Sequence, residues 1–208
     1  MAWLADKMKK WAAQIDRHAP GKGDSVISGY DQVPDRPEEY AVWSEQAMKR
    51  LEAAVPEQPA REEIMQGRAC VFTEEFGTGP INALAKLYAE TKSVDKVLEA
   101  MGADKGKFGH PCREGNVIYE IRSPRDPEAF AKAATPYEKQ LAACFCPLMR
   151  ATKNVISKEY CHCSAGWYKG IYEGIFKIPV RVEVLEAIIS GGEHCKFAIH
   201  LPDNHKLT

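Results

Sequence analysis

Two closely spaced pairs of cysteines are the residues of this chain best suited to chemistry. Cys144 and Cys146 form one C-x-C pair, and Cys161 and Cys163 form a second. Residues two apart share a face in an extended segment but point nearly opposite ways in a helix, so these pairs favour a turn, a strand end or a helix entry. The spacing predicts a metal or redox site beside a pocket for a small organic molecule.

Several chemistries fit these thiols. Zinc is the default metal for thiolate ligands, an iron–sulfur cluster uses the same ligands, and Cys195 is a further candidate ligand. A dithiol redox role and plain burial are the alternatives, because free cysteine is among the most buried residue types. Cys163 has a further property: at a helix N-terminus its thiolate would be stabilised by backbone N–H groups, which suits a metal ligand or a nucleophile equally well.

Other side chains near the pairs could take part in catalysis or binding. His162 is a candidate acid/base or alternative metal ligand, or else an exposed surface residue, and Glu173 could also move protons. Arg150 could bind a substrate carboxylate through two hydrogen bonds or be a surface charge. An aromatic lining of a ligand pocket, or alternatively packing in the core, is predicted for Trp167, Tyr168 and Tyr172.

The composition excludes some function classes. The 208 residues are 45% hydrophobic and 27% charged, and 28 Lys plus Arg balance 29 Asp plus Glu, which gives no electrostatic case for nucleic-acid binding. We expect no signal peptide, and no stretch approaches the roughly 18 apolar residues of a membrane span. A cytoplasmic location keeps thiols reduced, so metal or redox chemistry explains the seven cysteines better than a disulfide framework does.

The elements that must position these residues can be predicted from periodicity and from helix breakers. Helices are expected over residues 3–16, 37–54, 60–76, 81–91 and 93–101, with a connecting loop over 19–37. The first helix is amphipathic and is expected to pack on its own domain or on a partner subunit; its tryptophans and lysines leave membrane-surface binding as a minor alternative. Cys70 is expected to pack inside the third helix.

The second half of the chain has strand character. Residues 116–122 alternate as a strand, with Val117, Tyr119 and Ile121 on one face, and a short helix should run to Ala134. The segment 137–153 is ambiguous between helix and strand, 163–176 fits a helix, and 180–184 with 195–201 form a hairpin with Cys195 on its buried face. We therefore predict an α/β (α+β) fold, in which a helical region 1–104 packs with a mixed or antiparallel sheet in the cysteine-rich region 105–208 as one integrated domain.

Three segments carry a family resemblance: residues 161–170 (CHCSAGWYKG), 179–184 (PVRVEV) and 191–197 (GGEHCKF). They resemble the C-terminal half of the 4-vinyl reductase domain superfamily, which looks related to the aminothiazoline-carboxylate hydrolase-like proteins. Shared marks are a Cys-Pro element at Cys146-Pro147, a Cys that opens a Gly-containing helix, and a hairpin that ends in Gly-x-x-Cys-x-Phe. The resemblance covers about residues 105–202.

The resemblance implies a mixed α/β domain, often dimeric, that holds zinc beside an aromatic-ligand pocket. In that superfamily the zinc ligands are a Cys near the helix start, a Glu and a Cys on the first hairpin strand, and the last Cys of the hairpin. Cys161 or Cys163 and Cys195 match two of these, whereas the other two fall at Val184 and Ala187, which cannot bind metal. The extra thiols would have to compensate: Cys144, Cys146 and the second Cys of the pair 161/163.

These observations predict a small-molecule-binding protein with a cysteine-bound metal, for which zinc is the first candidate. The resemblance implies a homodimer. An open coordination position would permit hydrolysis of a C–N or C–S bond, with His162 or Glu173 moving protons. Four thiolates around the metal would instead indicate a structural ion in a ligand-sensing module without catalysis. An iron–sulfur or thiol-redox protein is the third class, so the sequence alone does not decide whether the chain is an enzyme.

Overall fold

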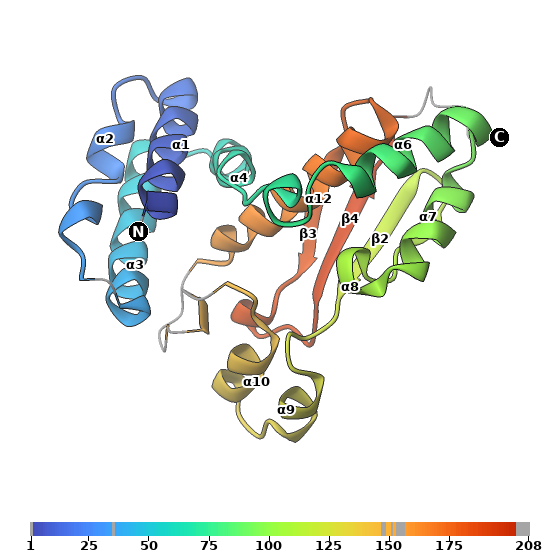
Figure 1. Ribbon diagram of the computed structural model, residues 1–208. Helices are drawn as coiled ribbons and strands as arrows, with labels where there is room; N and C mark the ends of the chain where they lie inside the picture. Colours follow the sequence, from blue (N-terminus) through green and yellow to red (C-terminus); the bar gives the residue numbers. More distant parts are fainter. Residues whose placement is uncertain (1, 35, 147–148, 151, 153–156, 203–208) are drawn as a thin grey trace. The chain divides into compact units, whose positions relative to one another are not determined.

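Helices fill the first half of the chain, and the four strands of one antiparallel sheet lie in the second half (Figure 1). This arrangement confirms the predicted α+β fold. The computed structural model describes residues 2–34, 36–146, 149–150, 152 and 157–202. Within these ranges, no helix has both the length and the apolar character needed to cross a membrane.

The helices of the first half largely follow the predicted pattern. They are α1 (Ala2–His18), α2 (Gly23–Val26), the 3-10 turn η1 (Tyr30–Gln32), α3 (Pro37–Ala54), α4 (Gln58–Gly67), α5 (Phe72–Phe76), α6 (Gly79–Thr91), α7 (Val94–Ala103) and α8 (Lys105–Phe108). Pro37 occupies the first turn of α3, where its missing N–H costs no hydrogen bond. Ser93 caps α7, because its side chain accepts a hydrogen bond from the Lys96 N–H. The predicted loop 19–37 contains α2 and η1.

The single helix predicted over residues 60–76 is wrong. α4 ends at Gly67 and α5 begins only at Phe72. Glycine is a poor helix former, and the following residue, Arg68, is only 1% exposed, so the chain leaves the helix where a long side chain enters the core. Cys70 lies in this break and is exposed, contrary to its predicted packing within a helix.

The second half contains the sheet and the helices around it. Its elements are β1 (Cys112–Glu114), β2 (Val117–Arg122), α9 (Pro127–Lys132), α10 (Pro136–Ala143), the 3-10 turn η2 (Lys158–Cys161), α12 (His162–Phe176), β3 (Arg181–Glu186), the 3-10 turn η3 (Ile188–Ser190) and β4 (Cys195–His200). The predicted helix at 163–176 and the hairpin of β3 and β4 are confirmed. The ambiguous segment 137–153 begins as helix α10 and leaves the helix at Cys144.

The sheet has the strand order β1-β2-β4-β3, and every neighbouring pair is antiparallel. In β2 the fully buried residues are Ile118 and Glu120, whereas Ile121, on the predicted common face with Val117 and Tyr119, is 41% exposed. In β4 Phe197 is buried, and Cys195 packs partly buried against the same core. An acidic residue therefore lies on the buried face of a central strand.

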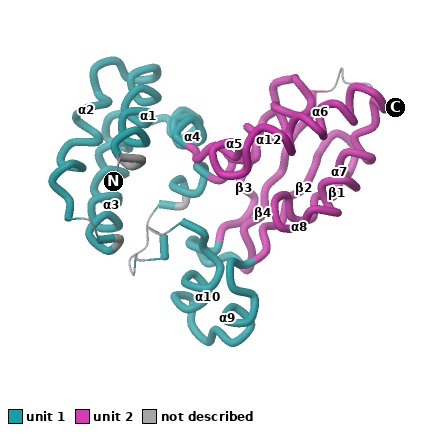
Figure 2. Tube along the Cα trace, viewed as in Figure 1, with its two compact units in different colours: residues 1–68, 124–163, 188–192 teal, residues 69–123, 164–187, 193–208 magenta. Residues whose placement is uncertain are grey.

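Two compact units divide the chain (Figure 2). Unit 1 comprises residues 1–68, 124–163 and 188–192, and unit 2 comprises 69–123, 164–187 and 193–208. Both units draw on segments from both sides of residue 104.

The core of unit 1 is built from α1, α3 and α4. Met8, Trp11 and Ile15 recur at helical spacing on α1 and are 0% exposed, as is Ile64 of α4. A Cβ atom at Gly67 would lie 2.5 Å from the side chain of Gln14, so α1 and α4 approach closely where α4 ends. The predicted amphipathic first helix thus packs on its own unit.

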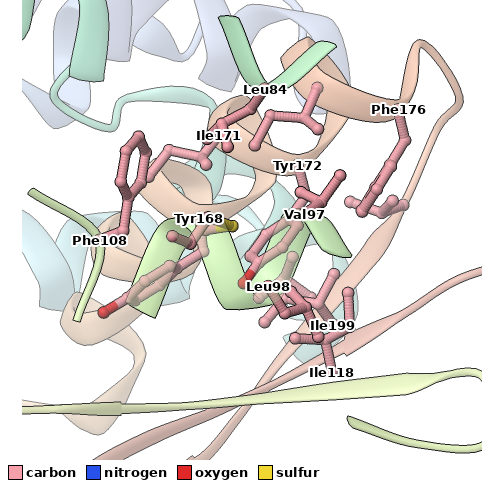
Figure 3. Packing of buried hydrophobic residues seen from close by; sticks show 14 of the residues in the cluster. Leu84, Val97, Leu98, Phe108, Ile118, Tyr168, Ile171, Tyr172, Phe176 and Ile199 are labelled. Carbon is pink, nitrogen blue, oxygen red and sulfur yellow. The ribbon is translucent and has the colours of Figure 1, made fainter. Parts of the chain in front are cut away.

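The core of unit 2 lies between α12 and one face of the sheet, with α6 and α7 beside them (Figure 3). α12 contributes Ile171, Tyr172 and Ile175, which are at most 1% exposed, and the strands contribute Ile118 and Ile199 at 0%. Burial of such side chains stabilises the fold by about 1.5–3 kcal/mol each. The alternating strand pattern and the helical stripe therefore meet in one apolar layer.

Candidate functional site

The second C-x-C pair follows a segment that is bound tightly to α4. The Arg61 guanidinium donates two hydrogen bonds to the Glu159 carboxylate, from Nε at 2.7 Å and from Nη2 at 2.8 Å. Hydrogen bonding of Arg61 to the Glu159 carboxylate is the main reason why the pKa of Arg61 is raised. His162 Nε2 lies 3.6 Å from the Glu62 carboxylate, and His162 is buried, so its alternative interpretation as an exposed residue is wrong. These contacts hold η2 and the start of α12 against α4.

A second arginine of unit 1, Arg68, is buried between two aromatic rings. Its Cζ lies 4.1 Å from the centroid of the Trp11 ring and 5.0 Å from that of Tyr160. Its Nη2 donates a long hydrogen bond of 3.5 Å to the Tyr160 hydroxyl. Its Nε and Nη1 are buried and have no hydrogen-bond partner among the residues that the structure describes. A cation in this position needs a nearby anion, because its burial alone costs several kcal/mol.

The thiols of two predicted site residues act electrostatically on Arg68. Burial is the largest influence and lowers the pKa of Arg68, but the hydrogen bond to Tyr160 and the charges that Tyr160, Cys163 and Cys146 carry when they ionise outweigh it and raise the pKa. Burial in turn raises the pKa of Tyr160, which keeps its phenol neutral at neutral pH. Of these three groups, the thiols of Cys163 and Cys146 are therefore left as the candidates to balance the charge of Arg68. The sequence did not predict Arg68 as a site residue. The available signal was Gly67, a poor helix former directly before it, at which α4 ends.

The first C-x-C pair lies after α10 and packs on the core of unit 1. Cys144 is the C-cap of α10, and its N–H donates to the Gln140 carbonyl at 3.0 Å. Both Cys144 and Cys146 are half-buried against that core. Arg150 donates its backbone N–H to the Cys146 carbonyl at 3.1 Å. Pro147, the second residue of the predicted Cys-Pro element, lies outside the described residues.

Among the described residues, the predicted metal ligands do not form a coordination group. Across the described ranges, no three His, Cys, Asp or Glu residues are arranged to hold a metal ion. The seven cysteines, all within those ranges, form no disulfide. Cys195 belongs to unit 2, whereas the two C-x-C pairs belong to unit 1. Zinc and an iron–sulfur cluster therefore stay predictions.

The predicted aromatic lining lies in the core of unit 2. Trp167 packs edge-on against Phe72, with ring centroids 5.5 Å apart, and Tyr168 packs on Phe197 at 4.8 Å. Figure 3 shows the rings of Tyr168 and Tyr172 among aliphatic side chains. These positions favour the core-packing alternative for the rings.

The other predicted proton carrier, Glu173, forms a hydrogen bond to the backbone of the chain. Its Oε1 accepts a hydrogen bond of 3.1 Å from the backbone N–H of Val180, just before β3. The bond ties the last turn of α12 to the start of the hairpin.

A buried carboxyl that sequence reasoning missed lies on β2. Glu120 is 1% exposed, and the Tyr172 hydroxyl donates to its Oε1 at 2.6 Å. Burial raises the pKa of Glu120 to about 8, although the bond from Tyr172 and the charge of Arg122 both oppose the shift. An acidic residue on the same face as Ile118 in an alternating strand was the available signal.

The fold and these contacts define a class: an α+β protein with a buried arginine beside two thiols in one unit and a buried carboxyl in the other. A family model matches residues 15–206, and the chain therefore belongs to DUF6144, a family of unknown function. No curated protein and no solved structure matches the chain. The resemblance to the 4-vinyl reductase domain superfamily stays a prediction.

Proposed function

We propose that this protein carries out thiol–disulfide chemistry in unit 1, with Cys163 as the nucleophile and Cys146 as the second thiol. One observation carries the proposal: the fully buried guanidinium of Arg68 interacts electrostatically with both thiols and has no carboxylate partner among the described residues. This function is the thiol-redox alternative that the two C-x-C pairs predict.

Two sources of positive potential act on Cys163. It is the second residue of α12, a helix of 15 residues, so it lies at the positive end of the helix dipole. Arg68 adds a full positive charge that cannot be lost at any physiological pH. Both favour the thiolate, which is the nucleophilic form of cysteine.

The reaction needs only the two thiols and a small-molecule disulfide. The Cys163 thiolate attacks one sulfur of the disulfide, whose S–S bond breaks, and the departing thiolate takes a proton from water. Cys146 then loses its proton to water and attacks the mixed disulfide at Cys163, which releases the second small thiol. Two electrons have passed from the protein to the substrate, and the protein holds a disulfide between Cys146 and Cys163.

The proposal includes a cytoplasmic setting, where reduced thiols are the normal starting state. The zinc hydrolase predicted from the sequence would use the same cysteines and is tested in the same protein preparation. Among the described residues, no group of three His, Cys, Asp or Glu is arranged to hold the zinc that this hydrolase would need.

The test is the rate at which the fully reduced chain reacts with a chromogenic aromatic disulfide. Cys163→Ser should abolish the fast phase, and Cys146→Ser should stop the reaction at the mixed disulfide. Cys70→Ser is the matched control, because Cys70 is exposed and belongs to unit 2. Arg68→Met should slow the fast phase by roughly tenfold, whereas Arg68→Lys, which keeps the charge, should slow it less.

Two further measurements make the outcome decisive. Mass spectrometry of the oxidised protein should find a peptide that joins Cys146 to Cys163. Equal reaction rates in Cys163→Ser and Cys70→Ser would contradict the proposal. About one zinc per chain after anaerobic purification, lost in Cys161→Ser or Cys163→Ser, would favour the metal-centre hypothesis instead.

A further inference from the structure

The carboxyl of Glu120 in unit 2 plays no part in the thiol chemistry. It lies in the middle of β2, which is flanked by β1 and β4, and is paired with Phe197 of β4. One oxygen, Oε1, accepts the 2.6 Å hydrogen bond from Tyr172 of α12. The other, Oε2, is buried and has no hydrogen-bond partner among the described residues.

The surroundings of this carboxyl offer little to stabilise a negative charge. Tyr172 and Tyr168 face it from α12, and Tyr168 accepts a hydrogen bond from Arg122, a cation whose charge also acts on Glu120. Cys112 of β1 acts on Tyr172, and Cys195 of β4 acts on Tyr168. A Cβ atom built on Gly109 would lie 3.7 Å from Oε2, so backbone closes that side. Ile118, on the same face of β2, and Tyr172 both belong to the apolar core cluster of unit 2, part of which is drawn in Figure 3.

We propose that Glu120 is a proton-binding site of unit 2, occupied in the folded protein at neutral pH. The protonated carboxyl keeps Oε1 as the acceptor of the Tyr172 hydroxyl and places no charge in the apolar layer beneath α12. Folding of the chain therefore takes up one proton at neutral pH. This inference does not depend on the proposed thiol reaction.

The direction of the pH dependence follows from the balance of effects on Glu120. Burial is the largest effect and raises its pKa from 4.5 to about 8, against the opposing effects of Tyr172 and Arg122. Because the folded pKa lies above the unfolded one, the stabilisation is complete below 4.5 and is lost as the pH rises to about 8. Across that window the folding equilibrium should weaken by roughly tenfold per pH unit.

The test measures urea unfolding of the full chain between acidic and alkaline pH in matched variants. Glu120→Gln mimics the protonated acid, so the stability of wild type relative to this variant should fall with rising pH and level off above the Glu120 pKa of about 8. Glu114→Gln is the control, because Glu114 is exposed on β1 of the same sheet, and it should keep the wild-type pH profile. Tyr172→Phe removes a hydrogen bond that favours the ionised form, so it should move the Glu120 transition to higher pH.

Infrared spectroscopy gives a readout that a purely structural role would not change. Wild type at neutral pH should show a carboxylic-acid C=O band that disappears in Glu120→Gln and that bleaches as the pH passes about 8, the pKa of Glu120. Absence of that band at neutral pH, or the same pH profile of stability in wild type and Glu120→Gln, would overturn the proposal.

Discussion

The guanidinium of Arg68 lies over the indole of Trp11, with Cζ 4.1 Å from the ring centroid, in the core of unit 1. Trp11 is 0% exposed and Arg68 is 1% exposed. A desolvated cation over a tryptophan face is worth about 2 kcal/mol. The ring therefore offsets part of the cost of burying the charge that the proposed thiol chemistry requires.

The Arg68–Trp11 contact should be measurable as a coupling energy. We expect a double-mutant cycle with Arg68→Met and Trp11→Phe, followed by urea denaturation, to give a coupling of about 1–2 kcal/mol. Trp43→Phe with Arg50→Met is the matched cycle, because that cation lies 6.0 Å from its ring. It should give a smaller value, and equal couplings in the two cycles would mean that burial does not strengthen the Arg68 contact.

The Arg61–Glu159 pair should make a large difference when only one partner is removed. Glu159→Gln leaves the buried Arg61 charge without its two-bond partner, and we expect a loss of about 3–5 kcal/mol in the free energy of unfolding. Glu63→Gln is the control, because Glu63 lies on α4, the helix that carries Arg61, and its side chain is 70% exposed. Replacing both Arg61 and Glu159 by Met should restore much of the stability, and no recovery in that double variant would argue against charge burial as the cause.

Two glycines of α12 form a matched pair for a packing test. A Cβ at Gly170 meets nothing within 4 Å, so Gly170→Ala should stabilise unit 2 by about 1 kcal/mol through helix propensity. A Cβ at Gly174 would lie 2.9 Å from Cγ2 of Ile81, which is 6% exposed, so Gly174→Ala should lose about 1–2 kcal/mol through overpacking. Thermal melting distinguishes the two signs, and Gly174→Ala should cost less in an Ile81→Ala background, which lacks the Cγ2 methyl, than in wild type.

The capping box at the start of α10, formed by Thr135 and Glu138, should contribute to stability. Thr135→Ala removes the side-chain acceptor of the Glu138 N–H and should cost about 1 kcal/mol. Thr78→Ala is the control, because Thr78 makes no capping bond to α6.

The same box predicts a loss of stability in acid. Hydrogen bonds from the N–H groups of Ala134 and Thr135 lower the pKa of Glu138 below 4.5. Its contribution is therefore present above that value and is lost as the pH falls through the folded pKa. Glu138→Gln should lack this acid-dependent part of the unfolding curve, and an unchanged acid limb would count against the assignment.

Local signals in the sequence determined much of the fold. Pro37 and the prolines after Ala54 bound α3 at the predicted residues, because proline suits a first helical turn and cannot continue a helix. The alternation of Phe197, Ile199 and Leu201 gave the buried face of the hairpin, since strand side chains repeat every two residues. The cysteine pairs could likewise be found by spacing alone.

Only the tertiary structure revealed that the ionisable side chains of Arg68 and Glu120 are buried. Arg68 lies 92 residues from Tyr160 in sequence and Glu120 lies 52 residues from Tyr172, so no local pattern could pair them. Whether a charged residue on a helix end or a strand is solvated or buried depends on what packs over it, which is a property of distant segments. The sequence by itself supplied the thiols and the elements that carry them, while long-range packing decided which cation faces those thiols and which carboxyl holds a proton.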